Sequence, residues 1–238
     1  MELDADVAAV WKVILSIQGE RLASQIVSFN LSPESVKDVL AQKPRTLFER
    51  AFQTIVKNRV QRGGIMAPGA GLVKLGENGK GLASRWYPQT LERRIRAIHS
   101  ERHKINFIHG DGVEFLRTNA HRGGIAFFID PPYTVAAKRL YVHSEIDHEE
   151  IFRIAHSLRG DFLMSYDNAR PIRDLAKKYK FDTRPVAMKN THHSVMRELL
   201  VGRNLDWARS PIDFSENSLF ENLQAHGNAS GQAYNGIL

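Results

Sequence analysis

Apolar and polar side chains recur at helical spacing through much of the first hundred residues. Five apolar residues of the opening segment fall on one face of a helix: Val7, Val10, Trp11, Ile14 and Leu15. This spacing predicts a helix that begins directly after Asp4. The segments 32–42, 45–60 and 90–101 predict further helices, and Ser32 is the expected cap of the first of these.

Beyond residue 104 the pattern changes to short apolar runs that alternate with helical segments. Predicted strands lie at 104–110, 124–130 and 161–167, and predicted helical segments at 112–118, 147–159 and 171–179. The last two predicted strands, 181–189 and 196–204, are separated by only a few residues and predict a β-hairpin. Alternation of strand and helix predicts an α/β fold.

Between these two regions, segment 61–89 is rich in glycine and has no sustained periodicity. Such a segment is either a flexible linker or an ordered functional loop. It mixes basic with aromatic side chains, which favours the functional loop. The tail, residues 210–238, is polar and contains many small residues, so we expect it to be poorly ordered.

Composition excludes several classes of protein. The chain has no cysteine, which excludes disulfides, zinc fingers and thiol catalysis. It has no run of about 18 apolar residues, and its first residues lack the basic-then-apolar order of a secretory signal. We therefore expect a soluble, cytoplasmic protein that does not enter a membrane. The histidines show no ligand spacing with acids on one face, so we expect no metal site.

Positive charge is concentrated in one part of the chain. The formal net charge is +7, and segment 43–104 contains 14 Lys and Arg against 4 Asp and Glu, a balance of +10, so the remainder sums to −3. A local basic region in an otherwise mildly acidic chain is typical of a polyanion partner. The alternative is a solvated basic helix at 91–104.

The sequence "FFIDPPY", residues 127–133, places unusual chemistry after a buried strand. In open α/β sheets, ligands bind at the carboxyl ends of strands, where Asp130 is expected. The Asp130 carboxylate and the Pro131 carbonyl could accept both N–H groups of an exocyclic base amine, and so free the nitrogen lone pair. Tyr133 could stack on a base that has left the duplex. The alternative is a turn that ends the strand.

Five segments taken in order resemble the S-adenosylmethionine-dependent, adenine-specific DNA methyltransferases of the alpha-type motif order. They are "ELDADVAAVW", "INFIHGDGVEFL", "FFIDPPY", "FLMSYDN" and "MRELLVGR". The resemblance implies a Rossmann-like methyltransferase sheet with a carboxyl-terminal β-hairpin and an inserted target-recognition segment. It implies transfer of a methyl group to the N6 amine of a flipped adenine in double-stranded DNA. The order of segments favours adenine over cytosine.

The resemblance also implies a division of the chain. Residues 1–42 would be an amino-terminal part of the methyltransferase core, and 43–104 the inserted target-recognition region. Residues 105–209 would be the catalytic core, followed by the tail 210–238. The family's first cofactor-binding strand and its glycine-rich turn have no counterpart before Glu2. From this we expect an amino-terminal truncation and weak or absent binding of S-adenosylmethionine.

Site residues follow from the same resemblance. The catalytic set is Asp130, Pro131, Pro132 and Tyr133. The cofactor set is Glu2, Gly110, Asp111 and Asp130, with Glu2 assigned to the ribose hydroxyls and Asp111 to the adenine amine. The DNA-binding set is Arg59, Arg62, Lys74, Lys80, Arg85, Trp86, His192 and His193.

Simpler roles remain open for four of these positions. Glu2 could be a neighbour of a helix cap, and Asp111 could be the N-cap of the helical segment that follows it. Trp86 could pack within the insert rather than contact DNA. The cluster 166–168 could border the base pocket or begin the next helix.

Two rival functions are also open. The same tetrapeptide could serve an RNA adenine methyltransferase. The chain could instead be a non-catalytic DNA-binding remnant or one half of a split enzyme. The protein partners to consider are a cognate restriction enzyme and a separate amino-terminal fragment.

Overall fold

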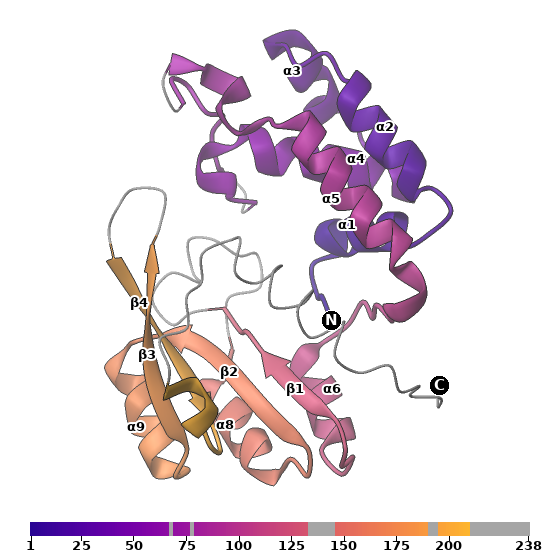
Figure 1. The fold of residues 1–238 in the computed structure, drawn as a ribbon. Coiled ribbons are helices and arrows are strands. Elements are labelled where there is room, and N and C mark those ends of the chain that lie inside the picture. The colour runs from indigo at the N-terminus through magenta and orange to yellow at the C-terminus, as the bar shows by residue number, and fades with distance from the viewer. Residues whose placement is uncertain (67–68, 77–78, 133–145, 190–194, 210–238) are drawn as a thin grey trace. The chain divides into compact units, whose positions relative to one another are not determined.

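The computed structural model describes residues 1–66, 69–76, 79–132, 146–189 and 195–209 (Figure 1). The chain divides into two compact units. The helical unit comprises residues 1–122 and 132–159, and the sheet unit comprises residues 123–131 and 160–238. Each is described by itself.

The helical unit begins with five α-helices. They are α1 (Ala5–Ile14), α2 (Gly19–Ser28), α3 (Pro33–Ala41), α4 (Leu47–Val60) and α5 (Pro88–Ser100). Short 3₁₀ turns lie at Arg62–Gly64, Gly81–Arg85 and Arg102–Lys104, and α6 (Gly112–Asn119) and α8 (His148–Ser157) complete the unit. These positions confirm the helices predicted from the periodicity.

Side-chain caps define where the first helices begin. The Asp4 carboxylate accepts hydrogen bonds from the amides of Asp6 and Val7, so α1 begins directly after Asp4 as predicted. Ser32 forms a capping box at α3, and Thr46 forms one with Glu49 at α4. Each cap stabilises its helix by about 1 kcal/mol, because it satisfies amides that have no partner within the helix.

One hydrophobic core joins the segments 1–42 and 43–104. Helix α1 packs along α4, and α2 packs along α5. The core is formed by residues from all five helices and from the loop before α5: Ala9, Val13, Ile14, Leu22, Ala23, Ile26, Val36, Ala51, Val56, Val60, Trp86, Leu91 and Ile95. The basic insert and the opening helices therefore form one packed body.

The sheet unit is a four-stranded mixed sheet in the order β1-β2-β4-β3. Its strands are β1 (Ala126–Ile129), β2 (Asp161–Asp167), β3 (Asp182–Lys189) and β4 (Val195–Gly202). Strand β1 pairs with β2 in parallel, whereas β4 is antiparallel to both β2 and β3. The mixed α/β class and the terminal antiparallel pair are as predicted, with β4 inserted between β2 and β3.

At its β1 edge, the two faces of this sheet differ in burial. On one face Phe127, Ile129, Met164 and Tyr166 are buried, and Tyr166 has no exposed surface. Helix α9 (Arg170–Lys178) packs against β3 within the same unit. On the other face the side chain of Phe128 is 68% exposed. The alternation along β1 therefore distinguishes a packed face from an open one.

The predicted strand 104–110 is reduced to one bridge. His109 pairs in parallel with Glu2, and no longer ladder forms there within the described residues. A strand needs a partner that stays extended over several residues. Glu2 cannot supply one, because Asp4 already caps α1 and the chain turns into that helix.

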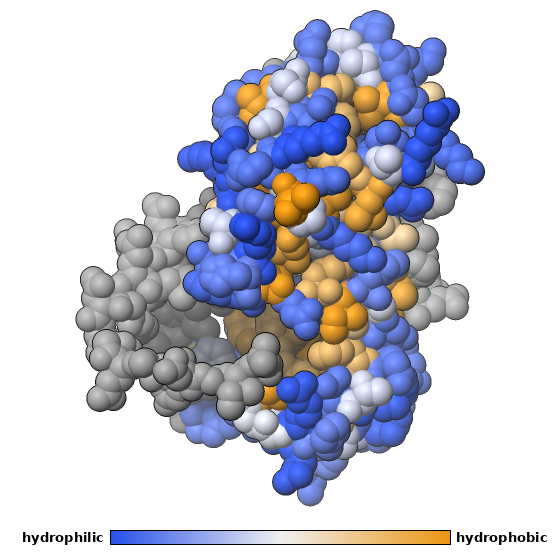
Figure 2. Space-filling model, turned by 90° about the vertical axis from the view of Figure 1, so that its right-hand side faces the viewer, coloured by the Kyte–Doolittle hydropathy of each residue, from blue (hydrophilic) through white to orange (hydrophobic). Residues whose placement is uncertain are grey.

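On the face shown in Figure 2, hydrophilic residues cover much of the coloured surface and apolar residues are visible between them. Most apolar side chains of the helical unit lie in the core described above, and the exposed ones include Ile17 and Leu47. Among the described helices, none combines the length and apolar character needed to cross a membrane.

Candidate active site

Three of the four predicted catalytic residues follow the carboxyl end of β1. The strand ends at Ile129, which is buried, and Asp130 follows it at the surface. Pro131 is buried and Pro132 is half-buried. A proline has no N–H and a fixed φ, so this pair ends the ladder and restricts the direction of the Pro131 carbonyl. Tyr133 lies outside the described residues.

Ser165 on β2 is the hydrogen-bond partner of Asp130. In the parallel pair β1–β2, Ile129 is in register with Met164, so the next residue of each strand is Asp130 and Ser165. The Ser165 hydroxyl donates to the Asp130 carboxylate, and this bond lowers the pKa of that carboxyl. A carboxyl at the end of a sheet strand is thus held by a buried hydroxyl on the adjacent strand.

Desolvation acts on Asp130 in the opposite direction and is the larger influence. The residue reaches the surface, but enough protein surrounds its carboxyl that burial raises its pKa above the usual value for aspartate. The Ser165 bond only partly offsets this effect. Carboxyl groups with raised pKa values occur at functional sites more often than elsewhere, although structural sites also produce them.

The predicted cofactor residues Glu2, Gly110 and Asp111 are brought together within the helical unit. The amide of Gly110 donates to the carbonyl of Glu2 at 2.9 Å, and the Glu2 amide donates to Ile108 at 3.1 Å. Trp11 belongs to α1, which follows Glu2, and Phe107 comes shortly before Gly110. Their aromatic rings stack with centroids 6.0 Å apart. Residues more than a hundred positions apart therefore meet at one bridge.

Both acids of this cluster also have local structural roles. One Glu2 oxygen accepts from the Asp4 amide at 2.8 Å, and one Asp111 oxygen accepts from the Val113 amide at 2.8 Å as the N-cap of α6. These are the simpler roles expected from the sequence. Each carboxylate has a second oxygen, so the caps do not use the full acceptor capacity of either acid.

The glycine-rich segment after α4 is held by an ordered set of hydrogen bonds in its described part. Within it, the Arg62 amide donates to Gly71 at 3.0 Å, and the Gln61 side chain donates to Ala70 at 3.3 Å. At its start the Asn58 side chain donates to Gly64 at 3.0 Å. These contacts favour the ordered loop over the flexible linker.

Arg85 closes the end of helix α4. Its Nη1 donates to the carbonyls of Asn58 and Gln61, each at 3.2 Å. Gly64 has φ of +71°, and a Cβ added there would lie 2.7 Å from the Arg85 guanidinium. The predicted DNA-binding residue Arg85 thus has a structural role, since it donates to carbonyls in the last turn of the helix and at the residue that follows it.

Arg59 on α4, Arg85 in the 3₁₀ turn Gly81–Arg85 and Arg94 on α5 form a basic cluster. Arg59 is half-buried, and burial lowers its pKa, with further lowering by the positive charges of Arg85 and Arg94. No acid of the described residues contributes to this pKa shift. Like charges held together in this way favour an anionic ligand, because the ligand would relieve their repulsion.

The other predicted DNA-binding residues divide into three groups. Arg62, Lys74 and Lys80 are exposed. Trp86 is 8% exposed in the core, 5.6 Å from the ring centroid of Phe29, which favours the packing role left open by the sequence. His192 and His193 lie outside the described residues.

Sequence reasoning missed Ser165 and Arg94. Ser165 lies in the apolar run "FLMSYD", and a buried hydroxyl in such a run is a signal that it has a partner. Arg94 lies in the basic helix at 90–101 and could not be told from its neighbours, because the cluster forms only when α5 packs in the helical unit.

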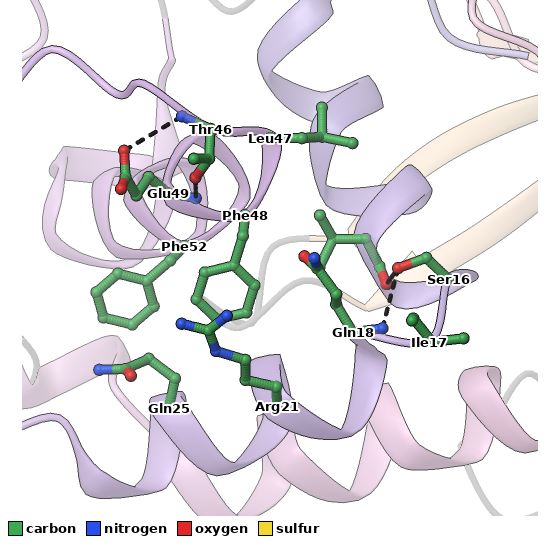
Figure 3. Close-up of a pocket in the computed structure, with 11 residues that line it drawn as sticks. Ser16, Ile17, Gln18, Arg21, Gln25, Thr46, Leu47, Phe48, Glu49 and Phe52 are labelled. Carbon is green, nitrogen blue, oxygen red and sulfur yellow. Dashed lines mark hydrogen bonds between the residues drawn. The ribbon is translucent and has the colours of Figure 1, made fainter.

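A surface pocket of about 560 Å³ lies between α2 and the start of α4 in the helical unit. The Arg21 guanidinium lies over the ring of Phe48, 4.4 Å from its centroid, on the wall of this pocket (Figure 3). Its lining contains none of the predicted site residues. In the described part of the chain, no three His, Asp or Glu side chains group as metal ligands.

No protein-family model matches the chain, and no curated protein is detectably similar to it.

Proposed function

We propose that this chain is the core of an S-adenosylmethionine-dependent methyltransferase that acts on the N6 amine of adenine in DNA. The observation that carries the proposal is the position of Asp130. It follows a buried parallel strand, precedes two prolines, and has a carboxyl whose pKa is raised by burial and lowered by Ser165. The resemblance of five ordered sequence segments supplies the identity of the reaction.

In the proposed reaction, the chain activates a weak nucleophile by accepting hydrogen bonds. The exocyclic amine of adenine is a poor nucleophile because its lone pair is delocalised into the ring. The Asp130 carboxylate accepts one N–H and the Pro131 carbonyl accepts the other, which favours a tetrahedral nitrogen with a localised lone pair. When the nitrogen gains a methyl group it must lose a proton, and the Asp130 carboxylate is the adjacent acceptor. Tyr133 would stack on the extruded base.

S-adenosylmethionine would supply an electrophilic methyl group on a sulfonium sulfur. The residues proposed to hold it are Glu2, Gly110 and Asp111. Their chemistry fits this role in part: each acid keeps an oxygen that no cap uses, and carboxylate oxygens accept from ribose hydroxyls and from an adenine amine. We extend the proposal to a Rossmann-like sheet, in which β1 and β2 form the parallel part and the terminal pair β3 and β4 the antiparallel part.

Methylation of mixed-sequence duplex DNA with radiolabelled S-adenosylmethionine tests the proposal. Asp130→Asn should reduce the rate by about a hundredfold or more, since the amide places a donor where a charged acceptor is needed. Asp161→Asn is the matched control, because Asp161 is exposed at the opposite end of the adjacent strand. A rate unchanged by Asp130→Asn would overturn the assignment of this residue. Identification of N6-methyladenine in the product separates adenine from cytosine as the target.

A second candidate is a non-catalytic nucleic-acid-binding module. The cluster of Arg59, Arg85 and Arg94 favours it, because this cluster requires no catalysis to bind a phosphate backbone. The two candidates differ in their response to Asp130→Asn. In a binding module this substitution should leave the affinity for DNA unchanged and there is no turnover to lose. In a methyltransferase it should reduce turnover and leave the affinity for DNA unchanged. Competition between duplex DNA and structured RNA separates the DNA enzyme from an RNA enzyme.

A further inference from the structure

Ser165 and Asp130 lie on the same face of the sheet because of the register between β1 and β2. Ile129 pairs with Met164 in the parallel ladder, and each strand continues by one residue to reach Asp130 and Ser165. Neighbouring residues in register place their side chains on the same face. The hydrogen bond between the two side chains is therefore a consequence of sheet geometry, not of a mobile contact across a loop.

The surroundings of Ser165 make its hydroxyl a fixed donor. Ser165 is 7% exposed, and its antiparallel partner on β4 is Leu200, which is 9% exposed. A buried hydroxyl must form hydrogen bonds within the protein, because it has no access to water. Asp130 is a partner of this hydroxyl in the central part of the sheet, where β2 has a partner strand on each side.

We propose that Ser165 is a positioning residue for the reaction, which holds the Asp130 carboxylate with one oxygen directed toward the target amine. This inference rests on the proposed function of Asp130. A carboxylate has two oxygens, and a hydroxyl that binds one of them restricts rotation of the group and leaves the other to accept from the base. The carboxyl must also stay ionised, since a protonated carboxyl presents a donor to the amine.

The remaining charged groups on this face do not account for the ionisation of Asp130. They are Asp161 and Asp167 at the two ends of β2, Glu198 opposite Asp167 on β4, and Asp182 and Arg184 on β3. None of the five contributes to the pKa shift of the Asp130 carboxyl, which has only burial and the Ser165 bond as causes. Ser165 is the one described side chain that opposes the effect of burial.

Carbon-13 NMR titration of protein labelled at the aspartate carboxyl carbons, combined with pH profiles of methylation, tests the inference. Asp130→Asn identifies the resonance. Ser165→Ala should raise the Asp130 pKa, because a hydrogen bond to a charged acceptor is lost. The acid limb of the kcat profile should move to higher pH by the same amount, with KM for duplex DNA unchanged. Ser165→Thr keeps the hydroxyl on a strand-favouring residue and should restore both values.

Ser84→Ala is the matched control. Ser84 is 2% exposed and donates to Gly81 in the helical unit, so its removal deletes a buried hydroxyl but should not change the Asp130 titration. An Asp130 pKa that is the same in Ser165→Ala as in the wild type would overturn the inference. If the pKa shifts as expected but the wild-type chain transfers no methyl group, the link between Ser165 and Asp130 stands and the proposed function fails. Circular dichroism of each variant shows that the comparison is between folded proteins.

Discussion

The amide of Gly110 donates a 2.9 Å hydrogen bond to the carbonyl of Glu2, although 108 positions separate the two residues in the chain. The bond uses only main-chain atoms, so it does not depend on either side chain. The bridge thus fixes the position of the Glu2 backbone, whereas the Glu2 side chain can be substituted without loss of the bond. This separation permits a clean test of the proposed cofactor cluster.

Glu2→Gln should weaken binding of S-adenosylmethionine by about tenfold or more, because an amide is a poorer acceptor for two hydroxyl donors than a carboxylate. Isothermal titration calorimetry of the 238-residue chain measures the change. Asp4→Asn is the control, since asparagine caps helices as well as aspartate does. Equal affinities for Glu2→Gln and the wild type would remove Glu2 from the site.

Asp111→Asn separates the two roles of Asp111. Asparagine retains the N-cap contact with the Val113 amide, so α6 should keep its stability. Loss of the negative charge should nevertheless reduce affinity for the cofactor's adenine amine by about tenfold. The midpoint of chemical denaturation and the calorimetric affinity are measured on the same samples. A change in neither quantity would leave Asp111 with its capping role alone.

Arg59→Gln and Arg94→Gln should each weaken binding to duplex DNA and reduce the salt dependence of binding. If each side chain contacts a phosphate, the slope of log K against log salt falls by about one per substitution. Fluorescence anisotropy at several salt concentrations measures this slope. Arg153→Gln on α8 is the control, because Arg153 is already paired with Glu150. An unchanged slope in both variants would mean that the cluster does not bind the backbone.

Trp86→Ala should lower the free energy of unfolding of the helical core by about 3–5 kcal/mol, since it removes a buried indole and leaves a cavity. The matched control is Trp207→Ala, because Trp207 is 63% exposed. Urea denaturation followed by circular dichroism compares the two. If Trp86→Ala left stability unchanged but reduced DNA binding, the packing role described above would be wrong.

Thr46→Ala should destabilise the start of α4 by about 1 kcal/mol, because the Thr46 hydroxyl accepts from the Glu49 amide at 3.1 Å. Thr118→Ala is a suitable comparison: Thr118 is exposed near the end of α6, where its hydroxyl bonds back to Glu114. Hydrogen exchange at the first turn of α4 localises the effect. Equal exchange in the wild type and in Thr46→Ala would show that the cap does not hold this turn.

Local signals in the sequence predicted the elements that depend on local physics. Asp4, Ser32 and the apolar spacing after them placed the first helices, because caps and periodicity act within a few residues. The alternation after residue 104 predicted β1, β2 and the terminal hairpin. The catalytic hypothesis depended on five short segments in a fixed order, each of which can be recognised in the sequence without knowing its contacts in the fold.

Contacts between distant residues could not be predicted in this way. The bond between Asp130 and Ser165 depends on the register of two strands separated by a helix. The approach of Arg94 to Arg59 depends on how α5 packs in the helical unit. The strand expected at 104–110 failed for the same reason: its apolar pattern indicates an extended segment but not the length of its partner.

The division of the chain into two units also has a consequence for synthesis. The polypeptide passes from one unit to the other after residues 122, 131 and 159. All five opening helices and their shared core are complete once residue 122 has left the ribosome, so that core can form early from local contacts. The β1 strand emerges soon afterwards, but β2 lies more than thirty residues downstream and β4 later still. During this interval Phe127 and Ile129 of β1 have no partner strand, because β2 has not been synthesised. Exposed apolar side chains of this kind favour aggregation or binding by a chaperone.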